Sequence, residues 1–170
     1  LFKGRDEELG ILDQKYYDGL SEHRRCVIAS GFPPGVGRRR LLKEYIISKV
    51  VTNKEKTYEP ISIELLENHS IENLLFQLND IILSYSYEKM LEIGGGSKEA
   101  KIDVAILLIN QATEKKEVII IRDNGACVLS NGFLSKWFKD IITHPKLTKR
   151  LCLFIASRNF INNRVESSIN

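Results

Sequence analysis

The chain has 170 residues, 43% of them hydrophobic and 28% charged, which suits one globular domain with its own core. Its formal net charge of +3 does not by itself indicate a nucleic-acid-binding protein, and the chain has no apolar run long enough to span a membrane. The three cysteines lack the spacing of a zinc site, and Cys26 and Cys152 lie within apolar runs, so we expect these two to be reduced, buried core residues of a cytoplasmic protein.

Short apolar runs along the chain predict buried parallel strands. They are rich in β-branched residues and nearly free of polar ones, as expected of strands that are covered on both faces. The runs lie at residues 25–30, 60–65, 118–121 and 151–156. Because helical patterns alternate with them, the sequence predicts a doubly wound α/β domain with right-handed crossovers. In such a sheet, ligands bind at the carboxyl ends of the strands.

Segments with helical periodicity separate these runs. Ser70 is placed to cap the clearest of them, and the last one is expected to start near Asn131 and to end before Pro145. The glycine-rich residues 94–97 are expected to form a flexible loop that joins two helices. The predicted helices cover residues 38–50, 71–85, 98–113 and 133–142.

The stretch GFPPGVGRRR, at residues 31–40, follows the first predicted strand and opens the first predicted helix. Such a loop binds phosphate because glycines let backbone N–H groups converge, and because the helix start adds unpaired donors. The standard phosphate-binding pattern requires G-x-x-x-x-G-K-[ST]. Here Gly31 lies one position early, and Arg38 and Arg39 replace the lysine and the hydroxyl residue. The alternative interpretations are a plain strand–helix connection, or a site in which only Arg38 faces the loop while Arg39 and Arg40 point to solvent.

Two later predicted strands end in polar residues. The strand in EVIIIRDNG ends at Asp123, where a carboxylate could organise Mg²⁺, but the following Asn124 cannot act as a general base. The strand in LCLFIASRN ends at Ser157 and Arg158, placed to present a cation towards a phosphate group. Each feature also occurs where an ordinary strand meets a polar loop.

Together with the opening sequence LFKGRDEELGILDQ, these motifs resemble AAA+ and STAND ATPases, the class that includes the NACHT and NB-ARC switches. In this resemblance GFPPGVGRRRLL corresponds to Walker A, VIIIRD to Walker B and FIASR to the sensor strand. The sequence that follows Asp123 is similar to that of bacterial NLR-like STAND proteins. Those proteins are often fused to TIR or other effector domains and are implicated in defence signalling.

The resemblance implies a P-loop NTPase domain over residues 1–170, a three-layer α/β/α sandwich with a mostly parallel sheet, within a longer multidomain protein. It implies ATP or ADP as ligand, and Asp123 as the catalytic residue that organises Mg²⁺ through water. Because Arg39 offers Mg²⁺ no oxygen and Asn124 is no base, we expect binding with weak or absent hydrolysis. The implied nucleotide-binding residues are Gly4, Arg5, Gly31, Pro34, Gly35, Val36, Gly37, Arg38, Arg39 and Arg158.

Three functions fit these observations. The first is a regulatory switch that uses nucleotide, whose partners are the other domains of the same chain and further copies on activation. The second is a nucleotide-free scaffold for interaction and oligomerisation. The third is an AAA+ initiator-like domain on DNA, which would need a basic winged helix beyond residue 170. For the first function, neither nucleic acid nor a membrane is an expected partner.

We also predict the strand order 60–65, 118–121, 25–30, 151–156, with the Walker A and Walker B strands adjacent.

Overall fold

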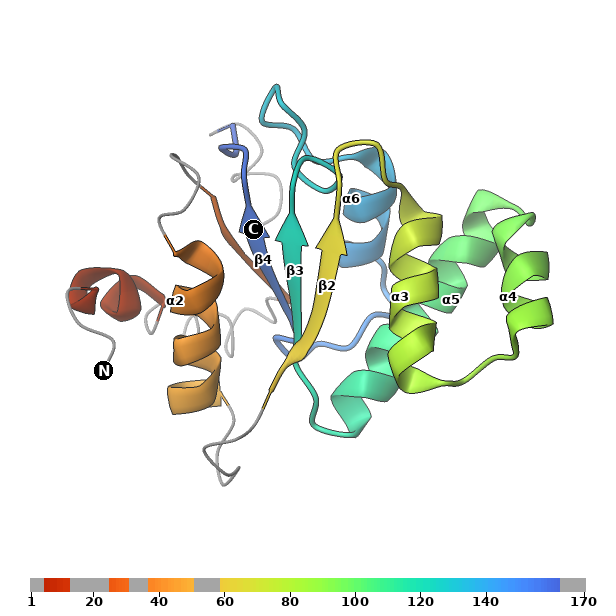
Figure 1. Ribbon diagram of the computed structural model, residues 1–170, viewed down its shortest axis with the longest axis horizontal. Coiled ribbons are helices and arrows are strands. Elements are labelled where there is room, and N and C mark those ends of the chain that lie inside the picture. The colour runs from red at the N-terminus through yellow and green to blue at the C-terminus, as the bar shows by residue number, and fades with distance from the viewer. Residues whose placement is uncertain (1–4, 13–24, 31–36, 51–58, 163–170) are drawn as a thin grey trace.

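A computed structural model describes residues 5–12, 25–30, 37–50 and 59–162, which form a parallel sheet with helices on both faces (Figure 1). The predicted α/β class is confirmed. The strands are β1 (Cys26–Ala29), β2 (Ile61–Leu65), β3 (Ile119–Asp123) and β4 (Leu153–Ser157). The helices are α2 (Arg38–Tyr45), continued by the π-helix η1 (Ile46–Val50), then α3 (Ile71–Ile82), α4 (Tyr87–Gly94), α5 (Lys98–Glu114) and α6 (Lys136–Ile142).

The sheet has the order β1-β4-β3-β2, and each neighbouring pair is parallel. The predicted order is therefore wrong, because β4 lies between β1 and β3. Burial explains the arrangement. Every residue of β4 is buried, as expected of a strand with a neighbour on each side and helices above and below, whereas β1 is only half-buried at the end of the described sheet.

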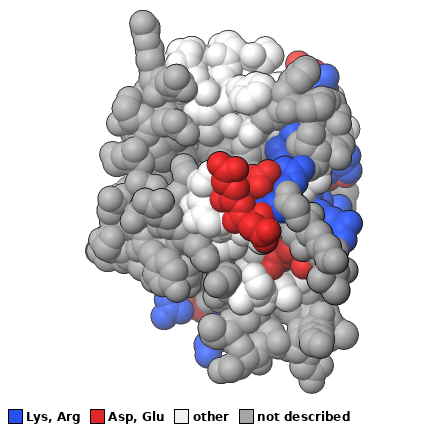
Figure 2. All heavy atoms as spheres, turned by 90° about the vertical axis from the view of Figure 1, so that its left-hand side faces the viewer, with Lys and Arg blue, Asp and Glu red and all other residues white. Residues whose placement is uncertain are grey.

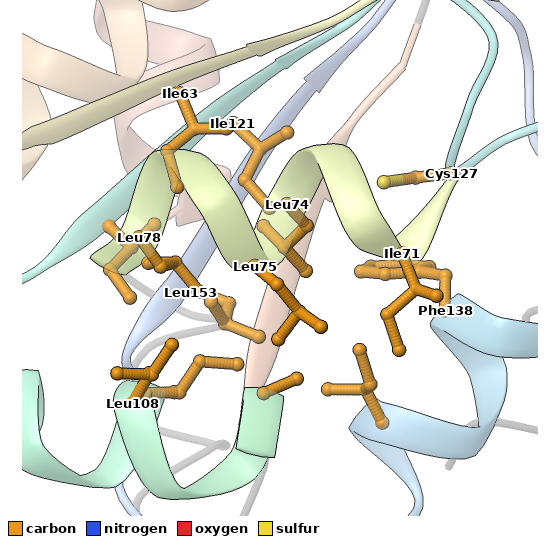
Figure 3. Close-up of a cluster of buried hydrophobic side chains, with 14 of the residues drawn as sticks. Ile63, Ile71, Leu74, Leu75, Leu78, Leu108, Ile121, Cys127, Phe138 and Leu153 are labelled. Atoms are coloured by element: carbon orange, nitrogen blue, oxygen red, sulfur yellow. The ribbon is translucent and has the colours of Figure 1, made fainter. Parts of the chain in front are cut away.

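Alternation along the strands divides the core into two layers. On one face, Ile63, Ile121 and Leu153 pack against α3 and α5, together with Phe138 of α6 (Figure 3). On the other face, Ile120 and Phe154 pack against the apolar side of α2 and against Leu12 of the helical segment 6–12. The larger layer thus fixes α3, α5 and α6, and the smaller layer fixes α2.

Helix α3 ends earlier than its apolar stripe predicts. The stripe extends to Tyr85, but Leu83 adopts a left-handed backbone with φ of 56° and ends the helix after Ile82. The buried Asn79 holds this bend, because its amide donates to the Tyr85 carbonyl and its oxygen accepts from the Tyr85 N–H, both at 3.0 Å. A separate helix, α4, follows before the predicted glycine-rich loop.

Helix α6 begins later than predicted. Of the predicted residues 133–142, only those from Lys136 onwards are helical. Leu134 forms an antiparallel bridge with Val128, and the Phe133 N–H donates to the Asn131 side chain at 3.0 Å. The apolar residues before α6 therefore close a loop.

Strand β2 lies at the other end of the described sheet, and α3 contacts its outer side. Gln77 of α3 donates from Nε2 to the Glu64 carbonyl at 2.8 Å and accepts from the Glu64 N–H at 3.1 Å. One side-chain amide thus satisfies both outward-facing backbone groups of Glu64.

Candidate functional site

The carboxyl ends of the strands meet at one side of the sheet, which we call the carboxyl edge. The register pairs Ala29 of β1 with Ala156 of β4, and Ser157 of β4 with Asp123 of β3. Helix α2 starts at the same edge (Figure 1). The structure therefore brings Gly37, Arg38, Arg39, Asp123 and Arg158 to the carboxyl edge. The predicted site residues Gly4, Gly31, Pro34, Gly35 and Val36 lie outside the described residues.

The start of α2 is built from a glycine and three arginines. Gly37 occupies the N-cap in a left-handed conformation, with φ of 79°, which glycine adopts without strain. Its carbonyl accepts the first helical hydrogen bond, from the Leu41 N–H at 2.8 Å. Three consecutive cations at a helix start oppose the helix dipole, so an anion bound here would relieve their repulsion.

The first two arginines lie in different surroundings. Arg38 is half-buried, and this burial lowers the pKa of its guanidinium, although arginine remains protonated at neutral pH. Arg39 is exposed and donates from Nη2 to the Ser62 hydroxyl on β2 at 2.8 Å. The structure thus ties Arg39 to the sheet, whereas the alternative interpretation directed Arg39 to solvent.

The face of the molecule that α2 covers carries both signs of charge. Figure 2 shows acidic side chains gathered next to basic ones on this face. The helical segment 6–12, which contains Asp6, Glu7 and Glu8, lies beside α2 on this side (Figure 1). Arg5 forms an ion pair with Glu8 at 2.7 Å. A mixed surface of this kind differs from the continuous basic surface that a nucleic-acid backbone requires.

Asp123 is the best-satisfied polar side chain at the carboxyl edge. Its side chain is 1% exposed, and its carboxylate holds the backbone of the following turn, which we call the Asp123 turn (residues 123–128). Oδ1 accepts from the N–H groups of Gly125 (3.2 Å), Ala126 (2.8 Å) and Cys127 (2.8 Å), and Oδ2 accepts from the Val128 N–H (2.9 Å) and the Ser157 hydroxyl (3.2 Å).

The Asp123 turn is also fixed from the core side. Ala126, Cys127 and Val128 are buried among the side chains that cover the larger face of the sheet, and the Cys127 side chain points into that cluster (Figure 3). Burial, with the nearby charge of Asp123 as a smaller cause, raises the pKa of the Cys127 thiol well above its ordinary value. Cys127 therefore serves as an apolar anchor and stays protonated.

The segment after β4 is joined to the same turn. The Arg158 N–H donates to the Asp123 carbonyl at 2.9 Å, while its side chain is exposed. The Asn159 side chain donates to the Val128 carbonyl at 2.9 Å, and the Asn159 N–H donates to the Ser157 hydroxyl at 3.1 Å. The sequence predicts Ser157 at the end of its strand, but it does not predict the hydrogen bond from the Ser157 hydroxyl to Asp123. No local spacing connects the two residues.

The geometry does not fit a Mg²⁺ site organised by Asp123. A carboxylate has about four acceptor positions, and the Asp123 carboxylate already accepts five hydrogen bonds, three at Oδ1 and two at Oδ2. Among the described residues, no group of three or more His, Cys, Asp or Glu side chains could hold a metal ion. The cations at this edge are arginines.

The prediction that Cys26 and Cys152 are buried core residues is confirmed only for Cys152. Cys26 and Cys152 lie on, or next to, the adjacent strands β1 and β4, and both are free thiols. Cys152 is buried, which raises its pKa to about 11, whereas Cys26 is half-buried on a strand at the end of the described sheet.

Comparisons with protein-family models, with curated proteins and with solved structures give no match to this chain. Within the described ranges, none of the helices is both long and apolar enough to cross a membrane.

Proposed function

We propose that this chain is the nucleotide-binding domain of a STAND-type signalling switch, and that it binds ADP or ATP with little or no hydrolysis. The observation that carries the proposal is the start of α2, where Gly37 and the half-buried Arg38 lie at the carboxyl edge of a parallel sheet. Ligands of doubly wound α/β domains bind at this edge, and an arginine guanidinium is suited to bind the oxygens of a polyphosphate.

The parallel sheet also brings the ends of the motif-bearing strands to one edge. Here β4, which ends in the sensor-like sequence FIASR, lies between β1 and β3. The Asp123 turn and the segment after β4 are hydrogen-bonded to each other, so a change at one would reach the other, as a switch requires.

The chemistry of the edge favours binding over turnover. Asn124 lacks a proton-accepting group, and its side chain donates to Glu64 at 3.4 Å. General base catalysis is worth ~10²–10⁴-fold in rate. Without that base, and with Asp123 occupied by its own turn, we expect hydrolysis by this chain to be near background.

The nucleotide-free scaffold remains the second candidate, because the Asp123 turn is complete without a ligand. The DNA-associated candidate has less support, since the face that α2 covers is of mixed charge (Figure 2). Defence signalling, effector fusion and assembly with further copies follow from the family resemblance and are proposed with it.

The test is recovery of nucleotide from the purified protein. The protein is denatured, and the released small molecules are identified by mass spectrometry. Stoichiometric ADP or ATP would support the switch. A clean protein that also fails to bind added ADP or ATP in calorimetry would overturn it and favour the scaffold. Robust ATP turnover, abolished by Asp123→Ala, would contradict the absence of hydrolysis.

A further inference from the structure

We propose that the Asp123 carboxylate is the internal anion of the turn that follows β3, and that nucleotide binding at the carboxyl edge does not require Mg²⁺. The first half of this inference concerns the folded chain alone. The second half rests on the proposed nucleotide binding.

The backbone of the Asp123 turn directs several N–H groups at one carboxylate. Successive N–H groups that point inwards form a concave anion-binding nest. In this turn four consecutive N–H groups, from Gly125 to Val128, converge on one carboxylate, at distances between 2.8 and 3.2 Å. Gly125 permits the shape because it adopts φ of 116°. A nest of this kind elsewhere holds an external phosphate, but here the chain supplies the anion itself.

Releasing the carboxylate for a metal would be costly. If Asp123 turned outwards, the N–H groups of Ala126, Cys127 and Val128 would lose their acceptor in buried surroundings. The turn could not follow the carboxylate, because its side chains are packed in the core. A water molecule on Mg²⁺ would have to displace one of the donors that hold the turn.

The neighbouring positions do not replace the missing ligands. Residue 39, where a hydroxyl would contact the metal, is an arginine whose guanidinium donates to Ser62. Residue 124 is an asparagine whose amide nitrogen points to Glu64. Mg²⁺ requires oxygen ligands in near-octahedral geometry, whereas Arg38 supplies a fixed positive charge at the same edge. We infer that arginine takes over the neutralisation of phosphate charge.

The first experiment measures metal dependence in the unmodified chain. ADP and ATP are titrated by calorimetry in buffer with MgCl₂ and in buffer with EDTA. The expected dissociation constants agree within about twofold. A loss of affinity of about tenfold or more in EDTA would overturn the inference. An absence of binding in both buffers would instead contradict the proposed function, and the role of Asp123 is then decided by the next two measurements.

The second experiment uses Mn²⁺ as a paramagnetic probe of the unmodified chain, with and without ADP. Amide signals of residues 125–128 are expected to keep their intensity, because the carboxylate they surround does not accept a metal-bound water. Selective broadening of these signals would overturn the inference. This measurement needs no variant, so it holds even if Asp123 variants fail to fold.

The third experiment compares Asp123→Asn with Glu64→Gln. Both remove one carboxylate at the carboxyl edge, but Glu64 is exposed and accepts from the Asn124 side chain at 3.4 Å, whereas Asp123 accepts from the backbone N–H groups of residues 125–128. Asp123→Asn is expected to speed hydrogen exchange of amides 125–128 by about tenfold or more, with Glu64→Gln unchanged. Unchanged protection of those amides in Asp123→Asn would show that the carboxylate does not hold the turn.

Discussion

The start of α2 and the Asp123 turn lie at the same carboxyl edge, yet they differ in charge. The turn contains its own buried carboxylate, whereas the helix start carries consecutive cations. Both follow a strand of the parallel sheet. The Asp123 turn satisfies its donors with its own buried carboxylate. The start of α2 presents a glycine and three arginines, which favour an anion from outside the described turn. The comparison shows that one edge of a parallel sheet can carry a turn closed by its own carboxylate and, elsewhere, a helix start rich in cations.

This difference separates two kinds of substitution. A change in the Asp123 turn should act on the free energy of unfolding, because the turn is part of the core. A change at the start of α2 should act mainly on ligand affinity, because its arginines lie outside the buried core.

The largest effect is expected for Asp123→Ala. Removing the carboxylate leaves the buried donors of the turn without an acceptor, so the free energy of unfolding should fall by about 3 kcal/mol or more. Urea denaturation measures the change. The matched control is Asp140→Ala, which removes an exposed carboxylate paired with Lys136 at 2.8 Å and should cost less than about 1 kcal/mol. Equal losses of stability in Asp123→Ala and Asp140→Ala would show that the Asp123 carboxylate does not hold the turn.

Arg38→Ala should act on affinity. We expect ADP binding to weaken by ~1.5–3 kcal/mol, the range for hydrogen bonds to charged groups, with little change in the free energy of unfolding. Arg39→Ala is the matched variant. Its loss of affinity should be below about 1 kcal/mol, because its guanidinium is bound to Ser62 on the sheet. Calorimetry that finds equal affinity for parent and Arg38→Ala would remove Arg38 from the site.

Ser157→Ala tests the contact between the turn and the segment after β4. The variant removes the hydroxyl that donates to Asp123 and accepts from Asn159, so the free energy of unfolding should fall by about 0.5–1.5 kcal/mol. In a double-mutant cycle with Asp123→Ala the two losses should not add. Additive losses would mean that the two strand ends are independent.

The smallest effect is expected in acid and lies away from the carboxyl edge. Hydrogen bonds from Lys101 at 2.5 Å, and then from Ser70, lower the pKa of Glu72 from 4.5 to about 2. Since the folded pKa is the lower one, the stabilisation is complete above about pH 4.5 and is lost as the pH falls towards about 2. Because Glu72 is partly exposed, we expect a loss of only about 0.5–1 kcal/mol.

The measurement is a set of urea denaturation curves at several pH values for the parent chain and for Glu72→Gln. The difference between the two should disappear in acid, because the parent then carries an uncharged side chain as well. A difference that stays constant down to the lowest pH would show that Lys101 does not stabilise the ionised Glu72. The same curves give the loss of stability in acid that comes from Glu72 alone. This loss has to be subtracted when the unfolding of Asp123 variants is compared at low pH.

The sequence predicts most elements because each is encoded locally. The apolar runs correspond to the strands, and the predicted helix 38–50 has the bounds of α2 and η1. Neighbours in the sheet are not encoded locally, and the predicted order was wrong for that reason. The burial of β4 on both faces is visible in its uniformly apolar sequence, which could have indicated a central strand.

The candidate site also has one part that the sequence predicts and one part that it does not. The glycine and arginines at the start of α2 are recognisable from sequence, and they lie at the carboxyl edge as expected. The Asp123 turn is not, because it depends on the backbone of Gly125 and on a hydroxyl 34 positions further along the chain. The position of Asp123 at a strand end was correct, but motif spacing cannot show where a carboxylate points.

The amide of Gln77 has a consequence for how copies of this chain can meet. A strand at the end of a sheet presents free N–H and C=O groups, which form a template for strand addition and aggregation. At Glu64 both groups are already bonded to Gln77, as if a short piece of another strand were present. A second chain could pair along β2 only by displacing that side chain. Gln77 thus protects this part of the sheet from uncontrolled growth.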